Sequence, residues 1–148
     1  MLKSAVVRPI GVIRTPFART EDCPVQPAFS NAEGTVEVLP RYRAGLRGLG
    51  RFSHIYALFL FDRSEREELA AVPYRERRRR GIFAIRSPHR PNHIGLSVLE
   101  VLSSRAGRIR VRGVDMLDQT PLLDIKPYVP GLDCRPVARS GRPARHAE

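Results

Sequence analysis

The segment Arg86–Gly95, RSPHRPNHIG, combines two prolines with side chains that could bind an anion. Each proline fixes its own φ angle, and Gly95 permits a backbone conformation closed to other residues. A segment stiffened in this way can hold Arg86, Arg90 and Asn92 at defined points while losing little entropy on binding. Arginine offers paired N–H donors suited to a carboxylate or a phosphate. We therefore expect a binding loop here; the alternative is a rigid connector whose arginines face water.

A second group of reactive side chains lies in residues 115–128, DMLDQTPLLDIKPY. Its three carboxylates, Asp115, Asp118 and Asp124, could accept hydrogen bonds from ribose hydroxyls or ammonium groups, or take a proton during a transfer. Asp124 and Lys126 are two residues apart, so on a strand they share a face. The alternative to a functional site is an Asp–Lys ion pair that holds a tight turn.

Metal sites and hydrolase triads find little support. His89 and His93 have the four-residue spacing of a helical metal pair, but Pro91 lies between them and no acidic or thiol ligand is near in the sequence. We therefore predict no metal site. No serine or cysteine lies in a nucleophile elbow. Cys23 and Cys134 form no CxxC pair and are expected to stay reduced.

The charge of the chain is consistent with a polyanionic partner. It has 26 Lys and Arg against 15 Asp and Glu, a net charge of +11, and only Lys3 and Lys126 are lysines. Such an excess attracts nucleic acid, the commonest polyanion of a cytosol. A general preference for arginine on a solvated surface explains the charge equally well. The run Arg75–Arg80, RERRRR, is on its own typical of an exposed, mobile loop.

Length and hydropathy restrict the class of protein. A chain of 148 residues, with 42% hydrophobic and 28% charged residues, has the size and balance of one globular domain. No apolar stretch approaches the ~20 residues of a membrane-spanning helix, and the first residues hold no signal-peptide core. We therefore expect a cytoplasmic protein with no membrane partner.

Periodicity and turn residues predict strands over 6–13, 35–39, 55–61, 82–85, 97–102, 108–114 and 122–125. Residues 55–61, IYALFLF, are the most apolar and fit a strand buried on both faces. Residues 42–49 are expected to form a short helical turn or a loop. Ser64–Glu67 matches a capping box that opens a short helix through Ala71, which Pro73 ends. The two prolines of residues 86–95 argue against regular structure there.

This order of elements predicts a mainly β fold: a single-domain antiparallel β-barrel with one or two short helices over residues 1–134. The strands follow one another without long helices between them, which argues against a parallel doubly wound sheet. No GxGxxG follows a strand, so the usual dinucleotide loop of an α/β fold is missing. Residues 135–148 have almost no apolar content and are expected to form a basic, disordered C-terminal tail.

Several segments together resemble the TsaA-like family, also called the TrmO family. They are IGVIRTPF (10–17), the QP of the next loop, GLRGLGRFSHIYALFLF (45–61), GIFAIRSPHRPNHIGLS (81–97) and DMLDQTPLLDIKPYVP (115–130). The resemblance implies an antiparallel barrel that binds S-adenosylmethionine and forms homodimers with methyl-donor pockets near the subunit boundary. It also implies methylation of N6 of threonylcarbamoyladenosine beside the anticodon of tRNA.

The same resemblance implies a set of methyl-donor contacts: Pro27, Ala28, Phe29, Asp62, Arg63, Arg86, Leu96, Leu117, Asp118, Gln119 and Thr120. Two places depart from the family's pattern. Asp62-Arg63 stands where relatives often have His-Gln, and Gln119 replaces the usual Gly of a DGTP turn. We expect no C-terminal domain of the kind that some bacterial members append to help hold a tRNA.

In this scheme Asp115 or Asp124 would receive the proton of the acceptor amine, and Arg86 would anchor the carboxylate of the donor. The expected RNA-binding residues are Arg77, Arg78, Arg79, Arg80, Arg90, Asn92, Lys126 and Tyr128. Tyr56, Phe83 or Tyr128 could stack on an unpaired base, although core packing explains Tyr56 and Phe83 more simply. Two alternatives stay open: a basic barrel that binds RNA or a nucleotide without catalysis, and a methyltransferase acting on another small acceptor.

Overall fold

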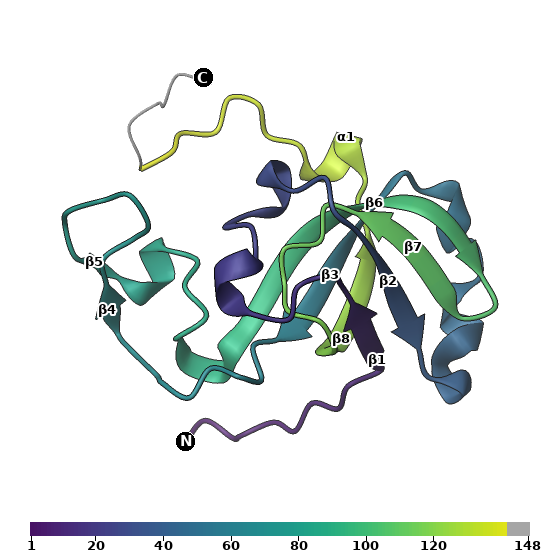
Figure 1. The fold of residues 1–148 in the computed structure, drawn as a ribbon, viewed down its shortest axis with the longest axis horizontal. Helices are drawn as coiled ribbons and strands as arrows, with labels where there is room; N and C mark the ends of the chain where they lie inside the picture. Colours follow the sequence, from purple (N-terminus) through teal and green to yellow (C-terminus); the bar gives the residue numbers. More distant parts are fainter. Residues whose placement is uncertain (142–148) are drawn as a thin grey trace.

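Six antiparallel strands close into a barrel in the computed structural model of the protein, which describes residues 1–141 (Figure 1). The strands are β1 (Gly11–Arg14), β2 (Glu33–Val38), β3 (His54–Leu60), β6 (Ile94–Arg105), β7 (Arg108–Arg112) and β8 (Thr120–Pro127). Their order is β1-β2-β7-β6-β3-β8, and pairing of β1 with β8 closes the barrel. The predicted mainly-β fold, an antiparallel barrel with few short helices, is confirmed.

Short helical turns join the strands. The 3-10 turns are η1 (Thr20–Asp22), η2 (Pro27–Phe29), η3 (Pro40–Leu46), η4 (Leu49–Arg51), η5 (Ile82–Ala84) and η6 (Pro91–His93), and one α-helical turn, α1 (Pro130–Asp133), follows β8. The helical turn expected near 42–49 is confirmed by η3 and η4. The segment 86–95, expected to be irregular, holds η6 and the first residues of β6.

The core of the barrel comes from every second residue of the strands. In β3, Ile55, Ala57 and Phe59 are buried, whereas the alternate residues are half-buried on the outer wall. The prediction that residues 55–61 are buried on both faces is therefore wrong. A strand in a barrel wall has only one inward face, so aromatic and aliphatic residues at the outer positions do not make it a two-sided core strand.

Gly95 is needed for close packing rather than for an unusual backbone angle. A Cβ atom at this position would collide with the ring of Phe59 on the neighbouring strand. Its φ angle is not among the positive values of the chain, whereas Asn92 and His93 just before it have φ values of 64° and 49°. The left-handed backbone conformation expected at Gly95 is therefore found at Asn92 and His93 instead. Gly95 itself leaves room for the Phe59 ring between β3 and β6.

The helix predicted from the capping box Ser64–Glu67 is wrong. The Ser64 hydroxyl lies 2.7 Å from Nδ1 of His89 and does not cap a helix. Ala70–Ala71 forms the short strand β4, which pairs with β5 (Arg80–Gly81) in a separate two-stranded sheet. Ser64 thus contacts the 86–95 segment instead of capping a local helix. A four-residue capping motif cannot reveal a contact with a residue 25 positions away.

The strand predicted over residues 82–85 is also wrong, because Ile82–Ala84 forms η5. Ile82 and Ile85 are buried while Phe83 is 76% exposed, a spacing of three that fits a 3-10 turn. The other predicted strands exist with shifted ends; the first begins at Gly11, and residues 6–9 carry no strand.

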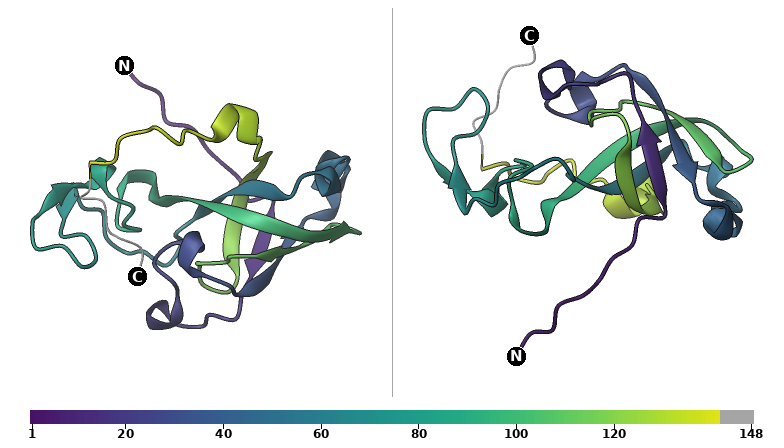
Figure 2. Two further views of the ribbon diagram at one scale, coloured as in Figure 1. Left: turned by 90° about the horizontal axis from the view of Figure 1, so that it is seen from above. Right: turned by 60° about the horizontal axis from the view of Figure 1, so that its bottom comes forward.

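The chain between β3 and β6 leaves the barrel and returns to it. In the views of Figures 1 and 2, β4 and β5 lie to one side of the barrel. Residues 135–141 carry no helix or strand, and the rest of the predicted tail, 142–148, lies outside the described residues. Among residues 1–141, no helix is long and apolar enough to cross a membrane.

Candidate cofactor and substrate site

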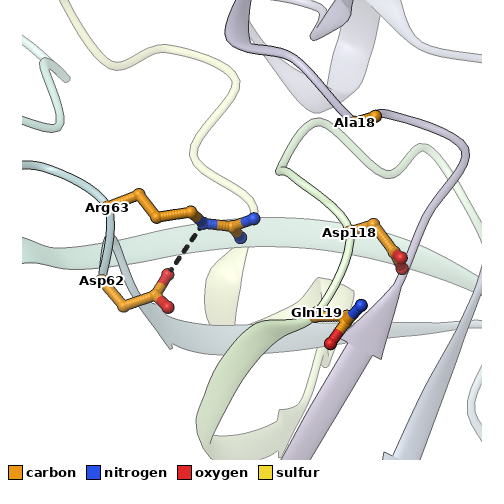
Figure 3. A pocket seen from close by; sticks show the side chains of 5 residues that line it. All are labelled: Ala18, Asp62, Arg63, Asp118 and Gln119. Atoms are coloured by element: carbon orange, nitrogen blue, oxygen red, sulfur yellow. Dashed lines mark hydrogen bonds and ion pairs between the residues drawn. The ribbon is translucent and has the colours of Figure 1, made fainter.

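A hollow of about 400 Å³ lies where the loop after β1, the end of β3 and the turn before β8 meet. Its lining residues are Ala18, Asp62, Arg63, Asp118 and Gln119. Figure 3 shows the Arg63 side chain extending across the hollow toward the turn that carries Asp118 and Gln119. The volume falls within the roughly 300–1,000 Å³ typical of small-molecule sites.

Arg63 is held in this orientation by two partners. Its Nε lies 3.3 Å from a carboxylate oxygen of Asp62, and its Nη2 donates a hydrogen bond to the Thr120 hydroxyl oxygen at 3.2 Å. The Thr120 hydroxyl donates in turn to the carbonyl oxygen of Leu117 at 2.7 Å. The end of β3 is thereby tied to the turn before β8, with a guanidinium group between them.

The turn 117–120 is fixed to the segment that follows β1. The carboxylate of Asp118 accepts a hydrogen bond from the backbone N–H of Thr15 at 3.0 Å, and the Asp118 N–H donates to the carbonyl oxygen of Phe17 at 2.8 Å. Gln119 follows with φ of 63°, in the left-handed region that favours glycine. A glutamine here takes the backbone conformation of the usual glycine and adds a polar side chain to the hollow.

Asp115 is the carboxyl group best suited to receive a proton. Burial raises its pKa to about 6, opposed by a hydrogen bond from the Ser97 hydroxyl at 2.7 Å and by the positive charge of Arg86. A base works best when its pKa lies close to the working pH. Ser97 belongs to β6, so the loop after β7 is attached here to the strand that follows the Arg86–Gly95 segment.

Arg86 is oriented by Gln26, which is not among the predicted site residues. Its Nη1 donates a hydrogen bond to Oε1 of Gln26 at 2.7 Å. Gln26 immediately precedes η2, in which Phe29 is 78% exposed. The Gln-Pro pair of the matching family segments was the available signal for this contact, which joins Arg86 to the residue just before the predicted donor-binding residues Pro27, Ala28 and Phe29.

Cys23 connects the two halves of the site. Burial raises the pKa of its thiol, the carboxylate of Asp115 raises it further, and Arg63 lowers it. Both charged groups therefore lie within electrostatic reach of one side chain in the loop after β1. Arg63 and Asp115 therefore belong to one electrostatic neighbourhood, which Arg86 shares through its effect on the pKa of Asp115.

Other predicted residues lie outside this neighbourhood. Asp124 forms an ion pair with Lys126 at 3.2 Å on β8, as in the structural alternative considered from the sequence. Leu96 is 56% exposed and pairs with Leu58 of β3, so its side chain faces away from Ser97 and Asp115. Tyr128 packs against Tyr56, with ring centroids 5.5 Å apart.

The predicted RNA-binding arginines belong to the chain between β3 and β6. Arg80 pairs with Glu76, Arg79 donates to the carbonyl oxygen of Ala70 at 3.0 Å, and Arg90 donates to that of Ile85 at 2.8 Å. Arg77, Arg78 and Asn92 are exposed. Core packing is the wrong explanation for Phe83, which is exposed. No cluster of three or more His, Cys, Asp or Glu suited to a metal occurs in residues 1–141.

Residues 12–134 match the model of the tRNA-methyltransferase O N-terminal domain. The chain belongs to the TrmO family. The resemblance predicted from sequence motifs is thereby confirmed, and the matched range contains every residue of the hollow as well as Asp115 and Arg86.

Relatives in the TrmO family extend this assignment. A Pyrococcus abyssi protein named "Probable S-adenosyl-L-methionine-binding protein" is 46% identical over 90% of this chain and 73% of its own length. The human "tRNA (adenine(37)-N6)-methyltransferase" is 33% identical over 86% of this chain, but this chain spans only 31% of it. A crystal structure of TrmO from Pseudomonas aeruginosa superposes with a TM-score of 0.79 at 41% identity, covering 94% of this chain and 62% of that one.

The residues of the site fit S-adenosylmethionine. This ligand carries an ammonium group, a carboxylate, two ribose hydroxyls and an adenine. The site offers the carboxylates of Asp62 and Asp118, the guanidinium groups of Arg63 and Arg86, and the amide of Gln119. These are complementary donors and acceptors for each polar group of the ligand.

Proposed function

We propose that this TrmO-family chain is an S-adenosylmethionine-dependent methyltransferase that modifies N6 of threonylcarbamoyladenosine beside the anticodon of tRNA. The observation that carries the proposal is the half-buried Asp115 carboxyl group, which accepts a hydrogen bond from the Ser97 hydroxyl at 2.7 Å and lies within electrostatic reach of Arg86. The names of the relatives, which include S-adenosyl-L-methionine-binding proteins and tRNA (adenine(37)-N6)-methyltransferases, support the donor and the class of acceptor. The predicted cytoplasmic location agrees with a tRNA substrate.

The chain's own residues would bind and orient the donor. S-Adenosylmethionine, when bound, supplies an electrophilic methyl group on a positively charged sulfur. Arg86 offers paired N–H donors to a carboxylate, with its orientation set by Gln26. Asp118 and Gln119 supply acceptors and donors for the nucleoside, and the Arg63–Thr120 bond keeps their turn in place. Most of the rate enhancement would come from holding the acceptor nitrogen in line with the methyl group.

Asp115 would remove the acceptor's proton. The N6 nitrogen of a carbamoylated adenosine is conjugated with a ring and a carbonyl group, so it is a weak nucleophile with a comparatively acidic N–H. The second carboxylate oxygen of Asp115 would take this proton as the new N–C bond forms and the bond between methyl and sulfur breaks, its electron pair staying on a sulfur that becomes a neutral thioether. The Ser97 hydroxyl remains hydrogen-bonded to Oδ1. A carboxyl group with a raised pKa is a stronger base than an ordinary aspartate and remains ionised at neutral pH.

A labelled-donor assay tests the proposal. The protein is incubated with methyl-labelled donor and tRNA that carries threonylcarbamoyladenosine without the N6 methyl group, and the labelled nucleoside is identified by mass spectrometry. The same tRNA without the threonylcarbamoyl group is the matched control and should gain no label. Label in no nucleoside would favour a non-catalytic RNA-binding barrel, and label in another acceptor would favour the second alternative.

We also propose that two chains associate through the outer wall of β3 and β6. Ile94, Leu96 and Val98 are 43%, 56% and 36% exposed there, and they pair across the sheet with Leu60, Leu58 and Tyr56. Exposed aliphatic residues in one row are typical of an interface. Sedimentation equilibrium should give a dimer mass for the protein, and Leu96→Arg should give a monomer; a monomeric wild type would overturn the proposal.

A further inference from the structure

The chain between β3 and β6 carries a small projecting unit, residues 69–85, which we name the arm. Its two strands pair Ala70 with Gly81 and Ala71 with Arg80, and the Ile82 N–H donates to the Leu69 carbonyl oxygen at 2.9 Å. Pro73, Ile82 and Ile85 are buried and do not belong to the core cluster of the barrel. The arm therefore buries three apolar residues outside that cluster.

Two aromatic rings of the arm are exposed, unlike these three residues. Tyr74 is 65% exposed and Phe83 is 76% exposed. A buried isoleucine lies on either side of Phe83, at 82 and 85, so the exposure of the ring is set by the 3-10 turn and is not a consequence of loose packing. The apolar surface of an exposed ring contributes no burial energy unless a partner covers it, so exposed aromatic side chains often mark a binding site.

Each ring lies close to an arginine. The Cζ atom of Arg75 is 5.2 Å from the centroid of the Tyr74 ring, and that of Arg90 is 6.0 Å from the centroid of the Phe83 ring. Such contacts restrict the side chains and place a positive charge beside a flat apolar surface. This combination suits a planar, apolar group that is attached to an anion.

The arm is strongly basic. It contains five arginines and one glutamate, Glu76, which pairs with Arg80. Arg77 and Arg78 are exposed and have no acidic partner within residues 1–141. Site residues flank the arm in the sequence: Arg63 of the hollow precedes it by six residues, and Arg86, whose charge acts on Asp115, follows it directly. A ligand held by the arm would therefore extend toward the reacting groups.

We infer that the arm binds unpaired nucleotides of the RNA substrate, with bases stacked on Tyr74 and Phe83 and phosphates bound by Arg77 and Arg78. The inference rests on the proposed function and specifies which part of the RNA is recognised. Bases in a duplex have covered faces, whereas splayed loop nucleotides offer both a π face and a nearby phosphate. A protein partner would use the apolar surface without needing flat rings or unpaired arginines.

Leucine substitutions separate stacking from simple apolar contact. Tyr74→Leu combined with Phe83→Leu keeps two exposed apolar side chains but removes the flat rings. By fluorescence anisotropy at fixed salt, we expect this variant to bind an anticodon stem-loop RNA at least tenfold more weakly than wild type. Binding of a blunt duplex of equal length should change less than twofold. Leu132→Ala, which alters a 68% exposed residue of α1, is the matched control and should bind like wild type.

A second measurement uses the unaltered protein. Stacking quenches the fluorescence of 2-aminopurine, so this base placed in the loop of the RNA should be quenched on binding, and the leucine variant should lose the quenching. Unchanged affinity and unchanged quenching in the leucine variant would overturn the inference. A change in sedimentation without a change in RNA affinity would also overturn it and assign the arm to self-association.

The outcome for the arm can be distinguished from that for the reaction. A leucine variant that methylates tRNA as well as the wild type does would overturn the role of the arm alone. Wild-type protein that binds loop RNA through the arm but transfers no label would overturn the proposed reaction alone. Circular dichroism and melting temperature verify that each variant is folded, as expected for changes at exposed positions.

Discussion

At the scale of single residues, the pair of Arg86 and Gln26 gives the most direct prediction. Arg86→Ala removes a charged donor from the site, so it should weaken S-adenosylmethionine binding by about 1.5–3 kcal/mol, the scale of a charge-assisted hydrogen bond. Gln26→Ala only releases the Arg86 side chain from its 2.7 Å bond and should have a smaller effect. Isothermal titration calorimetry measures the Kd of S-adenosylmethionine for each variant. An unchanged Kd for Arg86→Ala would exclude a role of Arg86 in binding the donor.

The second residue prediction concerns the pH dependence of Asp115. The base must be ionised to accept a proton, so kcat/KM should rise with pH up to a pKa of about 6 and level off above it. Asp115→Asn should lower kcat at least a hundredfold and remove this inflection. A profile with the same inflection in the asparagine variant would assign the titration to another group.

The same carboxyl group affects stability with a defined sign. Its folded pKa, about 6, lies above the ordinary value of 3.8, so the folded state binds more protons between these two pH values and ionisation reduces stability as the pH rises. Above the folded pKa, the full loss of stability from ionising Asp115 applies. Below the pKa of the unfolded chain, this loss is absent. The stability difference between Asp115→Asn and wild type should therefore grow in favour of the variant across this interval.

Gln119 allows a third test at this scale. A non-glycine residue in the left-handed region destabilises the folded state by about 1–2 kcal/mol. Replacing it with glycine recovers only part of this energy, because glycine loses more backbone entropy on folding. Gln119→Gly should therefore raise the free energy of unfolding by about 0.5–1 kcal/mol. Gln119→Ala removes the same amide but keeps the constraint on φ of 63°, so thermal melting of the two variants separates the backbone effect from the side-chain effect.

At the scale of elements, the pairing of β3 with β6 depends on Gly95. A Cβ there meets the Phe59 ring, so Gly95→Ala should destabilise the protein by about 1–3 kcal/mol, the usual cost of overpacking a core. Gly45→Ala is the matched control, because its Cβ would meet no atom within 4 Å. Urea unfolding measures the free energy of unfolding of both variants. Equal values for Gly95→Ala and Gly45→Ala would show that the Phe59 ring moves aside without an energetic cost.

Local patterns predicted the barrel strands well and the arm poorly. Strands such as β2 and β7 were detectable because alternation along each one sets which side chains enter the barrel. The helix expected after Ser64 depended on a cap, and that hydroxyl instead meets His89, a residue 25 positions away. The site shows the same division: the sequence motifs contain Arg86 and Asp118, whereas the contacts through Ser97 and Gln26 depend on the folded structure.

At the scale of the whole molecule, the arginines of β7 and those of the arm differ in their acidic partners. On the barrel wall, Arg108 and Arg110 of β7 face the carboxylates of Glu37 and Glu33 on β2, at 3.8 and 2.8 Å. Exposed pairs of this kind add little stability each, but they neutralise the positive charge of the wall. On the arm, Arg77 is exposed without an acidic partner in the described chain. The positive charge of these β7 arginines is therefore neutralised locally, whereas that of Arg77 is not.

This division predicts how the affinity for tRNA depends on salt. Each phosphate contact releases counterions, so the slope of log K against log salt falls by roughly 0.7–0.9 for each lost contact. Arg77→Gln combined with Arg78→Gln should therefore lower the slope by about 1.5. Arg108→Gln combined with Arg110→Gln removes the same two charges from the barrel wall, where carboxylates already hold them, and should leave the slope nearly unchanged. Filter binding of tRNA across a series of salt concentrations measures both slopes. Equal reductions in the two double variants would mean that tRNA responds to the total charge of the chain, and a reduction only for the β7 pair would move the RNA-binding surface from the arm to the barrel.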